Sequence, residues 1–394
     1  MTPVFLSAPH RVMFAAGSVQ LVVAMVFWLP ELLLRAGVAV HPLTLGVPPA
    51  WGHGGSLVFG VFPLFIFGFL MTALPKWMAA PPLEARQYLP AFFLLAAGWA
   101  SFLLGLFVPF LLAPGVVLAA LGQAVGTATL AAILRRSESD RRHGSLVVAA
   151  LAIGVVAEVL YAWALLRGDA GFFRWAIEAG LWGCVAPVFV TVLHRMLPFF
   201  TGAVVPRYRC DASFALLVVL LLALLGHGLA QALNLFSWRW LCDGVVAGAA
   251  LRLSWQWQLR AGLKAPMLAM LHLGALWLGV GFGLYTLQSL LFLAGIAWGG
   301  LLPLHAVGAG FFTSVLIGMA ARVTRGHSGR PISDDRWAWP LFRLFQGVVV
   351  LRLLGEFFPG ANVAAGLGWL VIFGILAALY LPMYLRPRPD GQPG

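Results

Sequence analysis

The chain repeatedly carries apolar stretches of about 20 residues, the length an α-helix needs to cross the hydrocarbon core of a bilayer. Twelve such stretches lie near residues 10–35, 54–76, 89–110, 114–134, 145–166, 175–197, 212–233, 239–260, 267–291, 295–321, 339–358 and 363–385. The composition agrees, because 61% of the 394 residues are hydrophobic, only 10% are charged, and the mean hydropathy is +0.94. A soluble globule would carry about 25% charged residues. We therefore predict an all-α, polytopic membrane protein with about 12 transmembrane helices, forming one integral membrane domain over residues 1–394.

The distribution of Lys and Arg predicts the orientation of these helices. Basic residues gather in the loops after even-numbered stretches and in both tails, whereas odd-numbered loops hold only Arg35, Arg167, Arg174 and Arg239. Cytoplasmic loops are the ones that carry excess Lys and Arg. The first stretch is as long as the others and has no small-residue cleavage site behind it, so we interpret it as a retained helix. The sequence thus predicts a multi-pass membrane protein with both termini in the cytoplasm. The net charge of +12 then belongs to these loops, and no nucleic-acid partner is expected.

Histidines occur at two depths of the predicted bundle. A rise of about 1.5 Å per residue places His53, His227 and His305 in the outer leaflet, and His10, His194, His272 and His327 at the inner face. Ionisable groups within hydrocarbon are costly and are usually functional. The two layers could hold one metal centre each, or each ring could simply bond a backbone carbonyl or a hydroxyl. Neutral imidazole suits haem iron, copper and zinc alike, so the residue type does not name the metal.

Two buried carboxylates are interpreted differently. Glu356 lies one helical turn after Arg352, so an ion pair within the helix is at least as good an interpretation as a role in proton transfer. Glu158 has no such neighbour in its own helix, and an unpaired carboxylate at that depth must be neutralised or bonded. We predict that Glu158 is a catalytic acid that relays protons. The chain has no C-x-x-C-H motif, so any haem must be held by coordination alone.

Four segments of the sequence resemble one known family. The most specific runs from His305 to Pro331 and reads HAVGAGFFTSVLIGMAARVTRGHSGRP. The others are GFLMTALPKW ending at Trp77, RMLPFFT at 195–201 and LHLGALW at 271–277. Together they resemble the NnrS family of polytopic bacterial membrane proteins. The resemblance implies binding of haem, expected to be haem b, and of copper, and a role in nitric oxide metabolism, nitrosative stress and denitrification.

The resemblance also implies site residues. The matched positions are His53, His272, His305, Arg322, His327 and Arg330. Arg322 and Arg330 would pair with haem propionates, although a basic cytoplasmic loop is an equally good interpretation. Together with the depth argument, this gives four candidate metal ligands, His53, His227, His272 and His305.

This chain also departs from the family pattern. Many members carry His-x-His-Glu at the start of the second helix, where this chain reads His53-Gly54-Gly55-Ser56, and the loss puts a copper site built from that pair in doubt. His10 and His194 lie outside the common pattern, and they either replace the lost cofactor ligands or are incidental.

These features, with the resemblance, favour a haem-containing, or haem–copper, oxidoreductase of the bacterial inner membrane that reduces or otherwise detoxifies nitric oxide. Electrons would come from an external quinol or cytochrome, because the sequence has no flavin or nicotinamide fingerprint. Heme–copper oxidases also use twelve helices and a His from the second. They need paired His in the seventh helix and His-x-His in the tenth, where this chain has only His227 and His305. We therefore interpret the shared topology as analogy.

Two alternatives remain at this point. Proline near the middle or the start of the helices, at Pro63, Pro187 and Pro303, is typical of transporters, so the protein could export a metal, haem or a metal–nitrosyl species. A sensor or assembly protein that binds metal without turnover is not separated from the oxidoreductase by sequence.

Overall fold

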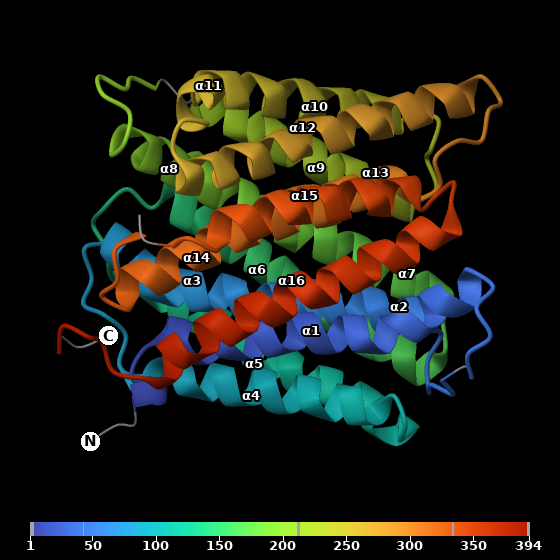
Figure 1. The fold of residues 1–394 in the computed structure, drawn as a ribbon, viewed down its shortest axis with the longest axis horizontal. Helices are drawn as coiled ribbons and strands as arrows, with labels where there is room; N and C mark the ends of the chain where they lie inside the picture. The colour runs from blue at the N-terminus through green and yellow to red at the C-terminus, as the bar shows by residue number, and fades with distance from the viewer. Residues whose placement is uncertain (1–3, 42, 211–212, 333–334, 392–394) are drawn as a thin grey trace. The chain divides into compact units, whose positions relative to one another are not determined.

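The computed structural model describes residues 4–41, 43–210, 213–332 and 335–391, and within these ranges the chain is helical with no strand (Figure 1). In chain order the α-helices are α1 (Pro9–Arg35), α2 (Pro49–Gly55), α3 (Phe62–Trp77), α4 (Ala85–Gly105), α5 (Leu112–Arg136), α6 (Arg142–Arg167), α7 (Ala170–Glu178), α8 (Ala186–Gly202), α9 (Phe214–Ala232), α10 (Arg239–Gln256), α11 (Leu259–Gly262), α12 (Pro266–Leu293), α13 (Leu302–His305), α14 (Ser314–His327), α15 (Ala338–Leu354) and α16 (Pro359–Leu385). Three π-helical segments join some of them, η2 (Ser56–Val61), η4 (Ala179–Val185) and η5 (Ala306–Thr313), and there are short 3-10 turns at η1 (Val4–Leu6) and η3 (Pro109–Leu111).

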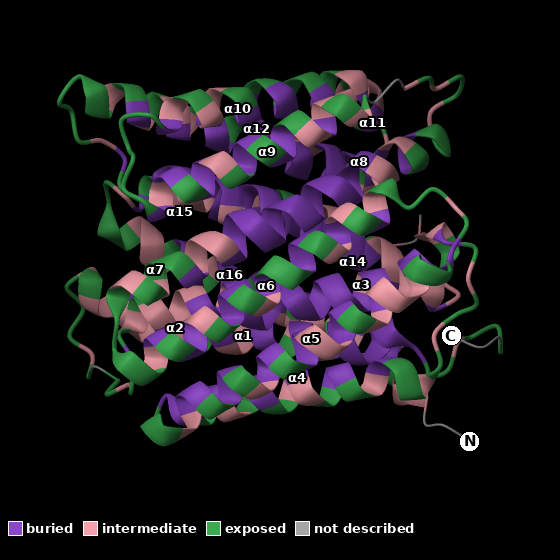
Figure 2. Cartoon of the chain, turned by 180° about the vertical axis from the view of Figure 1, so that it is seen from behind, coloured by how far each residue is buried: buried purple, intermediate pink, exposed green. Residues whose placement is uncertain are grey.

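The prediction of an all-helical membrane protein is confirmed. All twelve predicted stretches are helical over most of their length, although position 212, where the seventh begins, lies outside the described residues. Ten helices in the described ranges are long and apolar enough to cross a membrane. The other two, α10 and α15, have 18 and 17 residues, and α10 carries three charged side chains, Arg239, Asp243 and Arg252. The exposed residues on α4, α9 and α10 include many large apolar side chains, as expected for faces that meet lipid (Figure 2).

Every fourth long helix has a distinctive construction. The second, sixth and tenth helices are Pro49–Trp77, Ala170–Gly202 and Leu302–His327. In an apolar 18-residue stretch of each, 78%, 83% and 78% of the residues are buried, against 39–61% in the other seven of the ten candidate membrane-spanning helices. Each contains one of the three π segments. Pro63, Pro187 and Pro303, which suggested interrupted transporter helices, lie within two or three residues of these segments, and the helices continue through them. Widened turns of this kind are frequent at functional sites.

The tenth helix begins later than the sequence predicts. Residues 295–301 form a loop, although they continue an apolar run. Gly295, Gly299 and Gly300 there have φ angles of +77°, +76° and +46°, in the left-handed region that ends helices. The predicted stretch at 295–321 is therefore wrong over its first seven residues, because apolar composition alone does not reveal a glycine turn.

The contacts divide the chain into two compact units. Unit 1 comprises Met1–Val188, Val323–Arg330 and Phe373–Gly394, and unit 2 comprises Phe189–Arg322 and Pro331–Ile372. The helices α8, α14 and α16 each contribute residues to both.

Small residues allow close packing of α4 and α5 in unit 1, where the two helices lie side by side (Figure 1). A Cβ atom added to Gly98 would lie 2.5 Å from the backbone nitrogen of Ala119, and one added to Gly115 would lie 2.7 Å from that of Phe102. Backbone approach of this kind is how helices associate within lipid, where burial of apolar surface gives little gain.

The two terminal helices meet at one end of unit 1. The Arg11 guanidinium in the first turn of α1 donates to the carbonyl oxygens of Tyr384 and Arg386, at 2.9 and 3.0 Å, and so caps the C-terminal end of α16. The start of the first helix and the end of the last therefore share a face of this unit, as an even number of spans requires.

Candidate functional site

The most elaborate polar site of unit 2 is centred on Asp243, which is fully buried in α10. His227 of α9 places Nδ1 2.5 Å from Oδ1 of Asp243, and Arg239, one turn earlier in α10, donates from Nε to Oδ2 at 3.1 Å. The carboxylate can only accept from the imidazole, so Nδ1 of His227 carries a proton and Nε2 of the neutral ring carries the lone pair. Because Arg239 balances the charge of Asp243, His227 needs no charge of its own.

Four further polar groups hold this site in place. Ser289 donates to Asp243 Oδ2 at 3.3 Å, and Arg239 donates to the side-chain oxygens of Gln231 and Gln288 at 2.8 and 3.0 Å. The amide of Gln288 in turn donates to the carbonyl of Gly300 at 2.8 Å. Phe282 and Tyr285 face the His227 ring edge-on, with centroids 5.0 and 4.6 Å away. The imidazole is therefore fixed both by hydrogen bonds and by packing.

His305 lies beside an ion pair that the sequence predicts. Arg352 and Glu356 are 2.9 Å apart, which confirms the expected bond between positions four apart in α15 and the turn after it. Nδ1 of His305 lies 2.9 Å from the carbonyl of Leu301. Nη2 of Arg352 lies 2.9 Å from Nδ1 and 3.0 Å from Nε2 of the same ring, so the guanidinium lies against both nitrogens. A metal could reach Nε2 only if Arg352 moved.

His272 and His194, the other candidate ligands of unit 2, have separate partners. The Thr201 hydroxyl donates to the carbonyl of Leu197 at 2.7 Å, so it accepts from Nε2 of the buried His272 at 3.1 Å. Nδ1 of His272 is then the nitrogen with the lone pair. His194 has Nε2 3.4 Å from the carbonyl of Ser213.

Two histidines of unit 1 come together, and a third does not join them. The rings of His10 and His327 lie 4.7 Å apart, at the start of α1 and the end of α14. This agrees with the inner layer expected from the sequence. His53 instead stacks on the indole of Trp28 at 4.3 Å, near the other end of α1.

The predicted propionate-binding arginines have different surroundings. The Arg322 guanidinium of unit 2 lies 3.9 Å from the ring centroid of Phe200, and Arg330 of unit 1 has Nη1 3.4 Å from the carbonyl of Ser328. Neither position has a carboxylate partner among the ion pairs of the described residues.

Glu158, the predicted relay acid, lies in unit 1 with no solvent exposure. Neither carboxylate oxygen has a hydrogen-bond partner among the described residues. More generally, the described ranges contain no group of three or more His, Cys, Asp and Glu side chains that could hold a metal ion. The four predicted metal ligands lie on the helices where the sequence places them, and each contacts a different set of side chains.

Sequence reasoning missed several members of these sites. Arg239 was interpreted as an outer loop residue, but it is 5% exposed and lies at the centre of the Asp243 site. The four-residue spacing of Arg239 and Asp243, the same as in Arg352 and Glu356, could have revealed it. Gln123 in the interior of unit 1 was also missed.

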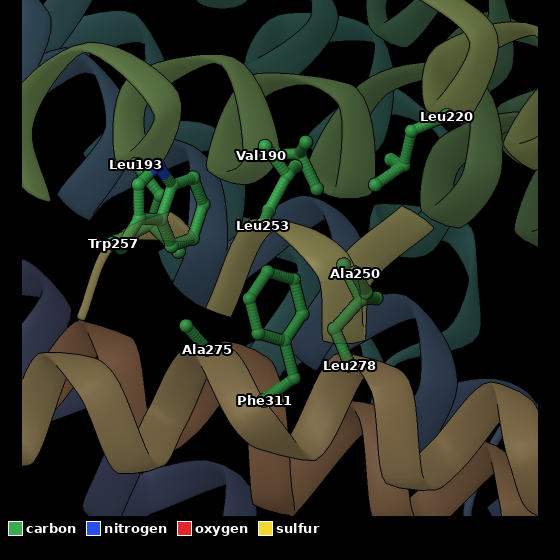
Figure 3. Close-up of a pocket in the computed structure, with 9 residues that line it drawn as sticks. All are labelled: Val190, Leu193, Leu220, Ala250, Leu253, Trp257, Ala275, Leu278 and Phe311. Carbon is green, nitrogen blue, oxygen red and sulfur yellow. The ribbon is translucent and has the colours of Figure 1, made fainter. Parts of the chain in front are cut away.

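Unit 2 also holds a small apolar pocket of about 10 Å³ (Figure 3). Its nine lining residues come from α8, α9, α10 and its C-cap, α12 and η5: Val190, Leu193, Leu220, Ala250, Leu253, Trp257, Ala275, Leu278 and Phe311. None is a metal ligand, and the space is no larger than one water molecule needs.

Comparison with known proteins identifies the fold and the family. A chain of a heme-copper terminal oxidase dimer, solved by cryo-EM, matches 99% of this chain and 86% of its own length with a TM-score of 0.65 and 12% sequence identity. The two proteins therefore share the arrangement of their helices over nearly the whole chain, and not only a similar number of helices. No curated protein matches the chain. The NnrS protein family matches residues 4–388, and the chain therefore belongs to the NnrS family.

Proposed function

We propose that this protein is a haem-containing redox protein of the bacterial cytoplasmic membrane that acts on nitric oxide, reducing or otherwise detoxifying it. Membership of the NnrS family and the fold shared with a heme-copper terminal oxidase support this function. The observation that carries it is the His227–Asp243 pair, a neutral imidazole oriented by a carboxylate inside an apolar bundle.

The chemistry of this pair fits a metal ligand. A histidine that binds a metal through one ring nitrogen almost always donates the other N–H to a carboxylate, a carbonyl or water. His227 donates to Asp243, and the Arg239 guanidinium supplies the counter-charge to that carboxylate, so the imidazole does not have to supply it. Bound haem would supply the iron that binds nitric oxide and exchanges electrons.

Two further histidines support a haem site by their place in the fold. His53 and His305 lie in the second and tenth long helices, close before the π segments η2 and η5. We propose His53, His272 and His305 as the remaining candidate ligands, with His10 and His194 as secondary ones. His305 would exchange the hydrogen bond from Arg352 for a metal bond.

Copper is a weaker part of the proposal. Copper held by protein side chains alone needs several donors at one place. The part of the chain that the structure describes contains no group of three or more candidate donors, and the second helix has Gly55 and Ser56 in place of the His-Glu of other members. Haem requires only one or two imidazoles, so the donor set fits haem better.

The other groups of the chain have defined tasks under this proposal. Arg322 and Arg330 would pair with propionates, Glu158 would supply protons, and electrons would arrive from a quinol or a cytochrome outside the chain. A guanidinium stacked on an aromatic ring, as Arg322 is on Phe200, keeps its donors for such an anion.

The test is an optical and electron paramagnetic resonance spectrum of protein expressed with ample haem and purified in detergent. We expect a haem absorption band that is lost or shifted in His227→Ala and weakened in Asp243→Asn. His41→Ala is the matched control, because that exposed loop histidine has no place in the proposal. Folded protein with neither haem nor metal would contradict the function. Haem that survives His227→Ala but is lost in His53→Ala or His272→Ala would move the ligand and leave the function standing.

A further inference from the structure

Unit 1 contains several buried polar side chains, of which the proposed haem chemistry uses only Glu158. Gln20 on α1, Trp99 on α4, Gln123 on α5 and Glu158 on α6 are all at most 6% exposed. Each has at least one side-chain nitrogen or oxygen without a hydrogen-bond partner among the described residues. Buried polar groups are normally paired with protein or with ordered water, so each unpaired group indicates something that binds it.

Three of the polar groups in this interior lie around one glycine. A Cβ added to Gly154 of α6 would lie 2.6 Å from Nε2 of Gln123 and 2.5 Å from Sγ of Cys184. Glu158 lies one turn further along the same face of α6. Cys184, in the π segment η4, is close enough to Glu158 to interact with it electrostatically. Gln123 of α5 and Cys184 of η4 therefore both pack directly against α6 at Gly154, one helical turn from Glu158.

The charges in this region decide what can bind there. Gln123 and Cys184, the neighbours from α5 and η4, cannot carry a positive charge, and Glu158 takes part in none of the ion pairs of the described residues. An ionised carboxylate in such an apolar interior is strongly disfavoured unless a cation joins it. A metal ion is a poor occupant, because no group of three or more acidic, thiol or imidazole donors occurs in the described ranges. A proton bound to the carboxyl itself removes the negative charge, so no other cation is needed.

We propose that the Glu158 carboxyl and the Gln123 carboxamide form a buried binding site for water and one proton. Protonated Glu158 donates to the water, and the Gln123 amide both donates to it and accepts from it. Gly154 lets the Gln123 amide approach α6 near Glu158, since any Cβ at this position would collide with that amide. The site stands whether or not the protein acts on nitric oxide, and only the use of its proton in that reaction rests on the proposed function.

Infrared spectroscopy of the full chain in lipid vesicles, in H₂O and in D₂O, tests the site without using activity or haem content. We expect a C=O band of a protonated carboxylic acid that moves to lower wavenumber in D₂O and is absent in Glu158→Gln. Gln123→Leu should shift this band, because the water loses its second partner. Gln20→Leu is the matched control, since it removes the same amide from another buried position in unit 1 and should leave the band in place.

Two results would overturn the proposal. One is a wild-type spectrum in which Glu158→Gln removes only a carboxylate band, which would mean that the group is ionised. The other is an acid band that responds neither to D₂O nor to Gln123→Leu, which would mean that the site is dry. If Glu158→Gln does not fold, as judged by circular dichroism and gel filtration, Glu158→Asp serves instead and should shift the band. Loss of nitric oxide turnover with these bands intact would count against the proposed function and not against the site.

Discussion

At the scale of single residues, the Asp243 site should contribute strongly to stability. Asp243→Asn removes the negative charge that Arg239 and His227 share, and it leaves a guanidinium buried without a counter-charge. Breaking one side of a buried pair typically costs about 3–5 kcal/mol. We expect a large drop in the unfolding midpoint of the purified protein, measured in detergent by circular dichroism.

The matched control for this change is Glu31→Gln. Glu31 pairs with Arg35 at 2.8 Å in the same i,i+4 spacing, but the Arg35 side chain there is 55% exposed. Exposed pairs contribute about 0–1 kcal/mol, so the midpoint should hardly move. Equal effects of the two substitutions would mean that burial of the Asp243 site carries no extra stability.

The same sites show how far single residues can be read from sequence. The ion pair of Arg352 and Glu356 follows from their spacing alone. The approach of Arg352 to His305 does not, because the two are 47 positions apart and only the packing of α13 beside α15 brings them together. The position of His227 within an apolar helix follows from the sequence, but the carboxylate that orients it lies on another helix, 16 residues away.

At the scale of helices, contact between α4 and α5 depends on glycine. Gly98→Ala would place a methyl group 2.5 Å from the backbone nitrogen of Ala119 and 2.6 Å from the carbonyl oxygen of Gly115, so the two helices must move apart. Overpacking of this kind costs about 1–3 kcal/mol. Gly248→Ala in α10 is the control, because a Cβ there meets no atom within 4 Å.

The two glycine substitutions should have opposite signs. Alanine is favoured over glycine within a helix by about 1 kcal/mol, so Gly248→Ala should leave the thermal midpoint unchanged or raise it slightly, whereas Gly98→Ala should lower it. A drop of similar size in both variants would contradict the prediction, because helix propensity favours alanine at both positions and only Gly98→Ala meets the backbone of α5.

The helices themselves were more predictable than their internal geometry. Long apolar runs identify a membrane helix because the bilayer leaves few other solutions. The π segments η2, η4 and η5 could not be predicted, since their residues are as apolar as those of the α-helical turns around them. The turn at Gly299 and Gly300 was missed for the same reason. The shared construction of the second, sixth and tenth helices therefore became visible only in the structure.

At the scale of the whole molecule, the orientation in the membrane remains a prediction with a direct test. In a variant whose three native cysteines are replaced, a single cysteine at Ala297 or at Glu138 reports which side each loop faces. Both residues are exposed, Ala297 in the loop after α12 and Glu138 in the loop after α5. The excess of Lys and Arg predicts that the loop with Glu138 is cytoplasmic. In intact spheroplasts a membrane-impermeant maleimide should therefore label Ala297→Cys, and it should label Glu138→Cys only after the membrane is permeabilised.

The reverse labelling pattern would invert the topology and move the His10–His327 pair to the outer face. Labelling of both positions in intact spheroplasts would mean that the number of membrane crossings between them is even. The expected pattern would place the start of α1 and the end of α16, which Arg11 joins, on the cytoplasmic side.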